Sequence, residues 1–468
     1  MRVILFLLLS CSVALGWSKD GTTYTTDGSQ SDVTSAISDA SAGDTVSVPS
    51  GSFTWGASAS YVSINKAITL QGAGTNTVIN ISPTASTYTS ATVRLTAAGA
   101  VLADMQFVQS GSAATTAISG STANGWRVTG IDHVGAATQG YFLYYSTYGL
   151  IDNCTISGGA SSNELIFGRG PTDSWQTASS MGTTNAVYVE GCTFYGSGYV
   201  CDANSNARMV VRFNLITGAS QKVDGHGKAS NTPARGVRHM EVYNNRWTDT
   251  TLYTVAIEMR GGTGMLFDNV ADVSGNGSWF FLTEYGSTAL WPNFTNIYQT
   301  PDYYPVDDQI GVGIDPKSAA SEPMYLWNNL KDGSDWALTD KSIPAAAITA
   351  YGSDFAITDI VGPDRDFFKQ GASFDGSSGV GVGTKAQMEA ITGTLTGVGF
   401  WVTDEGYWDT SNDSPSVTTD GQLYVWNGSS WELDYTPLVY PHPMLGTAEP
   451  DPPAEVVPTA VVGTLRAL

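Results

Sequence analysis

The sequence predicts an all-β fold in which short parallel strands stack into a solenoid. Between Gly149 and Asn276 the chain repeats one pattern: a short apolar run, then a small or amide residue, then a turn rich in Gly, Ser, Thr or Asp. Strand-based repeats of about 20 to 50 residues indicate coils that bury their faces against one another. The composition agrees, because 52 of the 468 residues are glycine and only 14% are charged, as in β-rich extracellular proteins with many turns.

One anchor residue follows the apolar run of each repeat. The anchors are separated by 38, 22, 31 and 24 residues, and they are Cys154, Cys192, Asn214, Asn245 and Asn269. Neighbouring strands lie about 4.8 Å apart, so we expect Cys154 and Cys192 to lie one above the other. We favour two small buried residues in one column over a disulfide. With Cys201, the cysteines after residue 16 are odd in number, which leaves at least one thiol unpaired.

The repeated lines, such as GLIDNCTISGG and HMEVYNNRWTDT, resemble the coils of the pectate-lyase-like superfamily. Similar lines run from about Asp32 to about Asn329. The resemblance implies a right-handed parallel β-helix, with an N-terminal helix that caps the first coil. Many chemistries are found on this scaffold, so the reaction has to be argued from the site residues.

The chain divides into four segments: residues 1–16, 17–366, 367–445 and 446–468. The first segment has one basic side chain, an apolar run and small residues at its end, which predicts a signal peptide that is too short to span a membrane. Leu9-Ser10-Cys11 would be a lipoprotein site, the less favoured alternative. We therefore expect a secreted, extracellular protein without a membrane span. The net charge of −22 argues against nucleic acid as a partner.

The segment 17–366, the predicted β-helix, begins with a helix. Val33, Ala36, Ile37 and Ala40 recur at helical spacing, and Gly43 is expected to end the helix. An open solenoid end exposes unpaired strand edges, so we interpret this helix as a cap. Strands are predicted at residues 45–48, 67–70, 92–95, 101–103 and 322–329.

The segment 367–445 predicts a small β-rich appendage. A short helical stretch, VGTKAQMEAI, precedes several strands, and the last two strands form a hairpin across Asn427-Gly428. We interpret the appendage as a cover for the open end of the solenoid, in preference to a sugar-binding module. The proline-rich segment 446–468 predicts a linker and tail.

Polar side chains recur 10 to 15 residues after five successive anchors. These residues are Arg169, Asp202, His226, Arg260 and Glu284. If the coils stack in register, they form one ladder on one face of a parallel sheet, within reach of hydrogen bonds and ion pairs. Solvated surface charge is the simpler interpretation for most of them. His226 is the exception, because glycine on both sides allows a ligand to approach closely.

The resemblance implies a polysaccharide lyase as the favoured function, acting on an acidic, uronic-acid glycan by β-elimination. Such a site neutralises the uronic carboxylate and supplies a base, and His226 with Arg260 or Lys228 would fill these roles. Asp202 and Asp224 would orient the histidine or hold Ca²⁺ through oxygen ligands, although no cofactor is certain. Asp307, Asp308 and Asp315 are a less favoured place for Ca²⁺. The remaining expected substrate contacts are Arg169, Lys228, Glu258, Glu284 and Trp279.

Two alternatives stay open. Polygalacturonase-type hydrolases on the same fold carry a Gly-His-Gly motif, which Gly225-His226-Gly227 matches, with an aspartate pair one coil earlier. Asp202 lies about one coil upstream but is followed by Ala203, so one carboxylate of the pair required for hydrolysis is not evident. The other alternative is a glycan-binding adhesin or tailspike-like protein without catalysis, in which aromatic side chains stack on sugars. The aromatic candidates are Trp175, Tyr199, Tyr253, Trp279 and Phe280.

Overall fold

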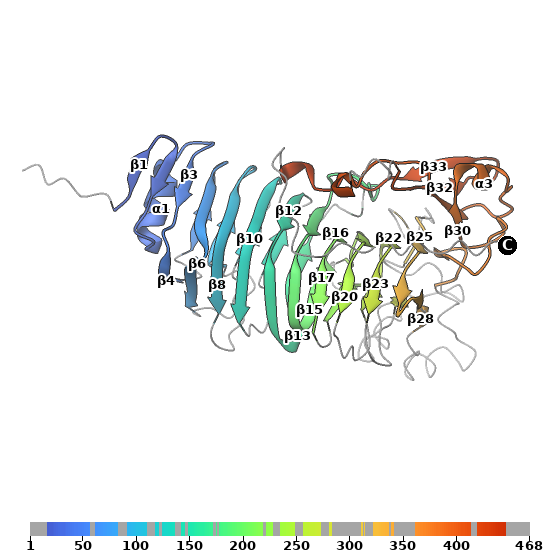
Figure 1. Ribbon diagram of the computed structural model, residues 1–468, viewed down its shortest axis with the longest axis horizontal. Helices are drawn as coiled ribbons and strands as arrows, with labels where there is room; N and C mark the ends of the chain where they lie inside the picture. The colour runs from blue at the N-terminus through green and yellow to red at the C-terminus, as the bar shows by residue number, and fades with distance from the viewer. Residues whose placement is uncertain are drawn as a thin grey trace, which may run out of the picture.

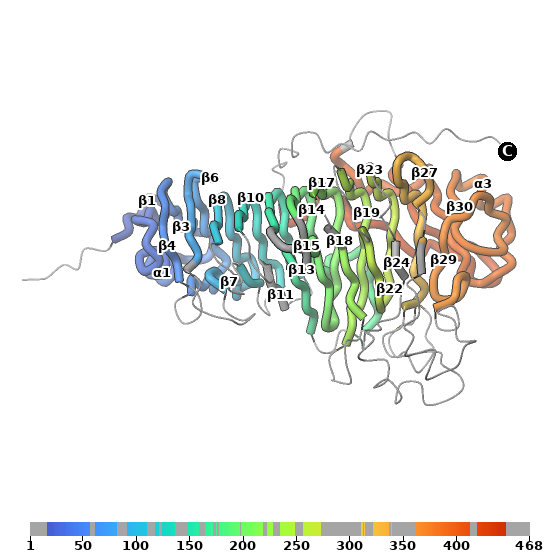
Figure 2. The backbone as a smooth tube through the Cα atoms, turned by 90° about the horizontal axis from the view of Figure 1, so that it is seen from below, coloured from blue at the N-terminus to red at the C-terminus, as the bar shows by residue number. Residues whose placement is uncertain are grey.

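The computed structural model is elongated, with its strands following one another along the long axis (Figure 1). Figure 2 shows the same order from blue to orange in a view turned by 90°. The structure describes residues 16–56, 61–82, 91–109, 118–120, 124–135, 142–145, 148–171, 175, 177–218, 221–227, 235–248, 256–272, 280–282, 310–311, 313, 322–336, 338–340, 361–412 and 419–445. The predicted signal peptide, apart from Gly16, and the predicted tail lie outside the described residues.

A 29-stranded sheet makes up most of the described chain, and a separate sheet has four strands. In the large sheet, all the described strand pairs are parallel except β1 (Ser18–Asp20) with β2 (Thr23–Thr25) and β26 (Leu330–Lys331) with β27 (Ser334–Asp335). The prediction of an all-β, solenoid-like stack of parallel strands is therefore confirmed. The strands fall into three columns, which we call A, B and C.

Column A continues from β2 and runs the length of the stack. Its strands are β3 (Thr45–Ser47), the first parts of β6 (Thr69–Ser82), β8 (Val101–Gln109) and β10 (Trp126–Gly135), then β12 (Gly149–Asp152), β14 (Val187–Glu190), β16 (Arg208–Arg212), β19 (His239–Tyr243), β22 (Thr263–Phe267), β25 (Met324–Trp327) and β29 (Phe367–Lys369).

Column B begins after the first corner of each coil. Its strands are β4 (Gly51–Gly56), the second parts of β6, β8 and β10, the first parts of β13 (Thr155–Arg169) and β15 (Thr193–Asn204), then β17 (Leu215–Thr217), β20 (Arg246–Thr248), β23 (Val270–Asp272) and β26.

Column C completes each coil. Its strands are β5 (Val62–Ile64), β7 (Val93–Leu95), β9 (Ile118–Gly120), β11 (Phe142–Tyr145), the second parts of β13 and β15, then β18 (Gln221–Gly225), β21 (Ile257–Met259), β24 (Phe280–Leu282) and β28 (Leu338–Asp340). The inward side chains of all three columns form one continuous apolar core.

The predicted N-terminal helix is present as α1 (Gln30–Asp39) and contacts β3, β4 and β5. Ser29 caps its first turn by accepting a hydrogen bond from the Asp32 N–H, and Val33, Ala36 and Ile37 are buried. The helix ends before Gly43, because Ala40 already has an extended backbone.

The corners between columns A and B explain why the anchors recur. In several coils the residue before the anchor has a positive φ, and these residues are Asn153, Phe213, Asn244, Asp268 and Asn328. The anchor side chains then point inward. Cys154 and Cys192 are buried free thiols, as favoured over a disulfide.

The asparagine anchors form a buried ladder that runs from coil to coil. The Oδ1 atom of Asn245 accepts hydrogen bonds from the backbone N–H and the Nδ2 of Asn214, at 3.1 and 2.9 Å. Asn269 and then Asn329 repeat this contact in the following coils. Amide side chains thus satisfy backbone donors at corners where no strand partner is available.

The C-terminal appendage contains the four-stranded sheet. Its elements are β30 (Val380–Gly383), α3 (Lys385–Glu389), β31 (Gly399–Val402), η4 (Thr410–Asn412), β32 (Gln422–Trp426), β33 (Trp431–Tyr435) and η5 (Pro443–Leu445). The predicted hairpin is confirmed, with Trp426 paired to Trp431.

The appendage packs against the outer side of column A. Trp401 lies 4.8 Å from Trp327 between ring centroids, within an apolar cluster that also includes Phe267, Tyr243 and Tyr188. Residues 436–445, which we call the C-terminal strap, run back along the coils towards β12 (Figure 1). Large aromatic side chains on the outside of column A therefore belong to a second core.

No helix among the described residues is long and apolar enough to cross a membrane.

Candidate active site

The predicted site residues that the structure describes lie on column C, where the side chains of four successive strands form a compact, largely buried polar cluster that we call the polar grid. Strand register arranges it in three rows: Glu164, Tyr199 and Lys222; then Asp202, Asp224 and Glu258; then Arg169, Asn204, His226 and Arg260. The third row extends past the strand ends through backbone hydrogen bonds from His226 to Ala203 and from Arg260 to Gly225, both 2.8 Å.

The single predicted ladder is thus two rows. Arg169, His226 and Arg260 share a register position, as expected, but Asp202 lies one row earlier, with Asp224 as its neighbour. Residues two apart on a strand point to the same face, so both rows face outward. Glu284, Lys228 and Trp279 lie outside the described residues.

Asp224 is held by two cations. The Arg260 guanidinium donates from Nε to Asp224 Oδ1 at 3.1 Å and from Nη2 to Oδ2, and Lys222 Nζ lies 3.7 Å from Oδ2. Asp224 is fully buried, and burial acts to raise the pKa of its carboxyl group. The charges of Arg260 and Lys222 outweigh burial and hold this pKa below its ordinary value, so Asp224 is ionised.

Asp202 shows the opposite behaviour. It is 4% exposed, and its Oδ1 has no hydrogen-bond partner among the described residues. Burial first, and then the negative charge of Asp224, raise the pKa of Asp202 well above its ordinary value. The pKa values of two neighbouring carboxyl groups are therefore shifted in opposite directions, which is the arrangement that acid–base chemistry requires.

Sequence reasoning missed three members of the grid, which are Glu164, Lys222 and Asn204. Glu164 is half-buried, and burial together with Asp224 raises the pKa of its carboxyl group. Lys222 Nζ donates to Glu258 Oε2 at 2.5 Å and lies 4.1 Å above the Tyr199 ring. The signal for Lys222 was its position two residues before Asp224, which puts both on one face of a strand.

His226 lies at the edge of the grid. Burial and the charge of Arg260 lower the pKa of the imidazole, which is therefore neutral at pH 7. Its Nδ1 is 2.7 Å from the Gly227 carbonyl oxygen, which assigns the proton to Nδ1 and leaves Nε2 as the basic nitrogen. Burial acts to lower the pKa of Arg260, but the ion pair with Asp224 raises it, so the guanidinium stays charged.

Metal ligands are not gathered in the part of the chain that the structure describes. No group of three or more His, Cys, Asp or Glu side chains there is arranged to hold a metal ion. Asp307, Asp308 and Asp315, the other predicted Ca²⁺ residues, lie outside the described residues.

Two of the predicted sugar-stacking aromatics have other contacts. Trp175 is buried and donates from Nε1 to the Gly236 carbonyl oxygen at 3.1 Å. The Lys222 ammonium covers one face of Tyr199. Tyr253 and Trp279 lie outside the described residues, and the described part of Phe280 is its backbone.

Comparison with known proteins identifies no family. No family model matches the sequence, and no curated protein matches it. Among solved structures, ORF18 of Geobacillus virus E2 is similar over 55% of each chain, with 16% sequence identity and a TM-score of 0.26. The match thus spans about half the length of that protein, and a likeness of this size supports no argument about fold or function.

Proposed function

We propose that the protein is a glycan-cleaving enzyme on a right-handed parallel β-helix of the pectate-lyase-like type, and that it hydrolyses glycosidic bonds at the polar grid. The observation that carries the proposal is the pair of adjacent carboxyl groups with opposite pKa shifts, Asp202 raised and Asp224 lowered. Hydrolysis of a glycosidic bond needs one protonated and one ionised carboxyl group.

In this mechanism Asp202 is the general acid. Its proton passes to the glycosidic oxygen as the bond to the anomeric carbon breaks, so that the leaving sugar departs as an alcohol. Asp224 accepts a proton from water, and the hydroxide oxygen bonds to the anomeric carbon. Arg260 and Lys222 keep Asp224 ionised, which it must be to act as the base.

The sequence favoured β-elimination, but we now favour hydrolysis. The reason is the charge of the two cations, Lys222 and Arg260. Lys222 is buried, which acts to lower its pKa, but Asp224 and Glu258 raise it. Lys222 and Arg260 therefore stay protonated and are suited to neutralise a carboxylate, but not to remove a proton.

β-Elimination remains the second candidate, and one observation favours it. The neutral His226 lies beside the charged Arg260, so a base and a neutralising cation for a uronic carboxylate are adjacent. In this alternative, Nε2 of His226 would remove the proton next to the carboxylate.

The test follows two products on a panel of neutral and uronic-acid polysaccharides. Hydrolysis gives new reducing ends without ultraviolet absorbance, whereas elimination gives reducing ends together with absorbing unsaturated ends. Asp202→Asn keeps a neutral, similarly shaped side chain and removes only the donated proton, so we expect activity to fall about 100-fold or more.

Asp272→Asn is the matched control, because it makes the same chemical change at an exposed aspartate on column B. Absorbing products that disappear in His226→Ala would favour elimination over hydrolysis. If no polysaccharide yields either product, the non-catalytic binding protein becomes the better proposal.

We further propose that the enzyme is exported and acts outside the cell, on the basis of the predicted signal peptide. N-terminal sequencing of protein recovered from the medium is expected to begin near Trp17. An intact Met1 would contradict export by cleavage.

A further inference from the structure

Two cysteines stand at the anchor position, where the later coils have asparagine. Cys154 and Cys192 occupy successive coils, and both side chains are buried in the continuous apolar core. Their coils pair in register, because Thr155 pairs with Thr193 and the Thr193 N–H donates to the Cys154 carbonyl oxygen at 2.8 Å. The two cysteines are therefore nearest neighbours in the anchor column, one coil apart.

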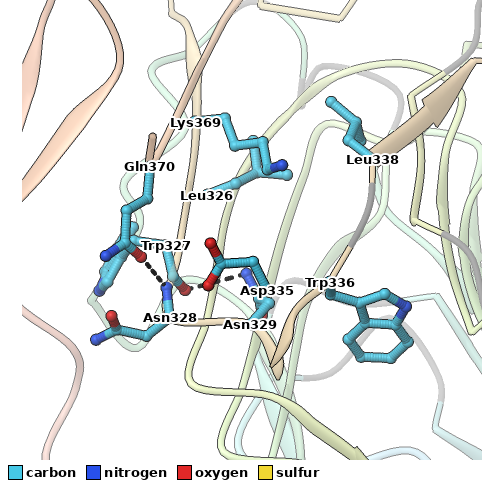
Figure 3. Close-up of a pocket in the computed structure, with 9 residues that line it drawn as sticks. All are labelled: Leu326, Trp327, Asn328, Asn329, Asp335, Trp336, Leu338, Lys369 and Gln370. Atoms are coloured by element: carbon cyan, nitrogen blue, oxygen red, sulfur yellow. Dashed lines mark hydrogen bonds between the residues drawn. The ribbon is translucent and has the colours of Figure 1, made fainter. Parts of the chain in front are cut away.

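The two thiols make the contact that the amide groups make in other coils. Each Sγ donates to the carbonyl oxygen of the residue two positions earlier, at 3.2 Å for Cys154 and 3.3 Å for Cys192. Asn329 makes the same contact in the last coil, from Nδ2 to the Trp327 carbonyl oxygen at 3.0 Å (Figure 3). A thiol is a weaker donor than an amide, so hydrogen bonding alone does not account for cysteine at these two corners.

The geometry of the pair suits a covalent bond. Neighbouring strands lie about 4.8 Å apart, and a disulfide joins Cα atoms that are about 4.4–6.8 Å apart. Both residues are free thiols in the structure, and their thiol groups are close enough to interact directly. Cys201 lies in column C, in register with Ile166 and Val223, so its strand neighbours offer it no thiol.

We propose that Cys154 and Cys192 form a reversible disulfide that joins the two coils when the protein folds in the presence of a small disulfide such as oxidised glutathione. One cysteine thiolate attacks the oxidant, forming a mixed disulfide and releasing one glutathione. The other cysteine attacks the mixed disulfide, forming the bond between the coils and releasing the second glutathione. The two cysteines lose two electrons and two protons, which the two glutathione molecules take up. This site does not rest on the hydrolytic function.

Burial determines when the bond forms. Burial raises the pKa of the Cys192 thiol well above its ordinary value, so the folded protein contains little of the thiolate that attacks a disulfide. The bond therefore forms while the corner is still open during folding, and the closed core protects it afterwards. The two cysteines are 38 positions apart, so the bond closes a long loop in the unfolded chain and stabilises the folded one.

The experiment refolds the full chain from urea with either reduced or oxidised glutathione. Remaining thiols are blocked with iodoacetamide, and peptides are mapped by mass spectrometry without reduction. After oxidative refolding, we expect peptides linked through Cys154 and Cys192, with Cys201 alkylated. The urea midpoint of the linked protein is expected to lie about 0.5 M or more above that of the reduced protein. Oxidised glutathione added after folding is expected to link the pair about tenfold more slowly.

Two variants complete the experiment. Cys192→Ser removes one partner and should abolish both the link and the difference between the two urea midpoints. Cys201→Ser changes a buried cysteine outside the pair and should keep both. The proposal is overturned by the absence of a linked peptide after oxidative refolding, by a link that uses another cysteine, by equal midpoints of the linked and reduced proteins, or by equally fast linking of the folded protein.

Discussion

Asp202 and Asp224 occupy one register position on neighbouring strands, yet their surroundings move their pKa values in opposite directions. Asp224 has two cations in contact, whereas Asp202 has a negative neighbour and a buried oxygen that finds no hydrogen-bond partner in the described part of the chain. Residue type alone does not separate the two aspartates, because contacts made by other coils set their protonation states.

The pH profile of the proposed hydrolysis follows from these states. Activity requires ionised Asp224, so it is lost as pH falls through the lowered pKa of that group. Activity also requires protonated Asp202, so it is lost as pH rises through the raised pKa of Asp202. The charge of Arg260 lowers the pKa of both carboxyl groups. Arg260→Gln should therefore move both limbs of the pH–rate profile to higher pH, and a shift of one limb alone would contradict this assignment.

Glu241 predicts a pH dependence of stability that is independent of catalysis. It is fully buried under the appendage, accepts from the Tyr435 hydroxyl at 2.6 Å and from the Gly182 N–H at 3.0 Å, and burial raises its pKa from 4.5 to about 7. A raised pKa in the folded state stabilises the protein fully below the unfolded value of 4.5, and this contribution is lost as pH rises through about 7.

The contribution of Glu241 to the free energy of unfolding that is lost between these two pKa values is about 3 kcal/mol. Glu241→Gln removes the titrating group, so the difference in unfolding free energy between pH 5 and pH 8 should shrink by about this amount. Urea denaturation of both proteins at the two pH values measures it. An unchanged difference would show that Glu241 does not titrate in this range.

At the scale of elements, the asparagine ladder ties successive corners together. The Nδ2 of Asn245 donates to the Val211 carbonyl oxygen at 2.8 Å, and its Oδ1 accepts from Asn214. Asn245→Ala leaves these buried groups without partners, and we expect it to lower the unfolding free energy by about 3 kcal/mol.

Asn80→Ala is the comparison for this ladder prediction. Asn80 also bonds across coils, to Ser52 Oγ at 2.8 Å, but that bond is exposed on column B. Its removal should cost about 0.5 kcal/mol. Equal urea midpoints for the two variants would show that the ladder adds nothing to stability.

The backbone conformation of Phe213 could not be predicted from the residues of its own strand. It has a φ of +54°, a conformation that favours glycine or asparagine, yet the residue is aromatic. Its ring stacks on Tyr440 of the C-terminal strap with centroids 3.7 Å apart. Stacking on a residue 227 positions away in sequence thus offsets the unfavourable backbone conformation of Phe213.

At the scale of the whole molecule, the C-terminal strap joins coils that are separate in sequence. Arg212 and Glu190 form a buried ion pair, with Arg212 Nε to Glu190 Oε2 at 2.7 Å. The strap completes it, because Arg212 also donates to the carbonyl oxygens of Leu438 and Val439, and the His442 N–H donates to Glu190. Buried charges are stable only with such full hydrogen bonding.

Deletion of residues 436–468 should therefore loosen the coils under the strap and leave distant coils unchanged. Backbone hydrogen exchange is expected to become faster in β14, β16 and β19. There Glu190 and Arg212 lose hydrogen-bond partners, and Tyr243 becomes more exposed to solvent. Strands β3, β6 and β8, which have no recorded contact with the described part of the strap, are the internal control. Uniform exchange across the stack would contradict a local role.

The repeat can be predicted from the amino-acid sequence, and much of the fold follows from the repeat. Parallel coils require an apolar run, a corner and an inward anchor in each turn, so the strands, the stacked anchors, the N-terminal helix and the hairpin were readable from local periodicity. The polar residues of column C could be predicted for the same reason, since each of them follows an anchor residue.

The other features depend on contacts between parts of the chain that are distant in sequence. Inserted turns of different length hid the register, and therefore which aspartates are neighbours. The strap and appendage pack on the side of column A through contacts between residues far apart in sequence. Glu241 and Tyr435 are 194 residues apart, and Arg212 and Leu438 are 226 residues apart. Burial and charge at a site sum over all the coils around it. For this reason the opposite pKa shifts of the two aspartates and the second core appear only once the chain is folded.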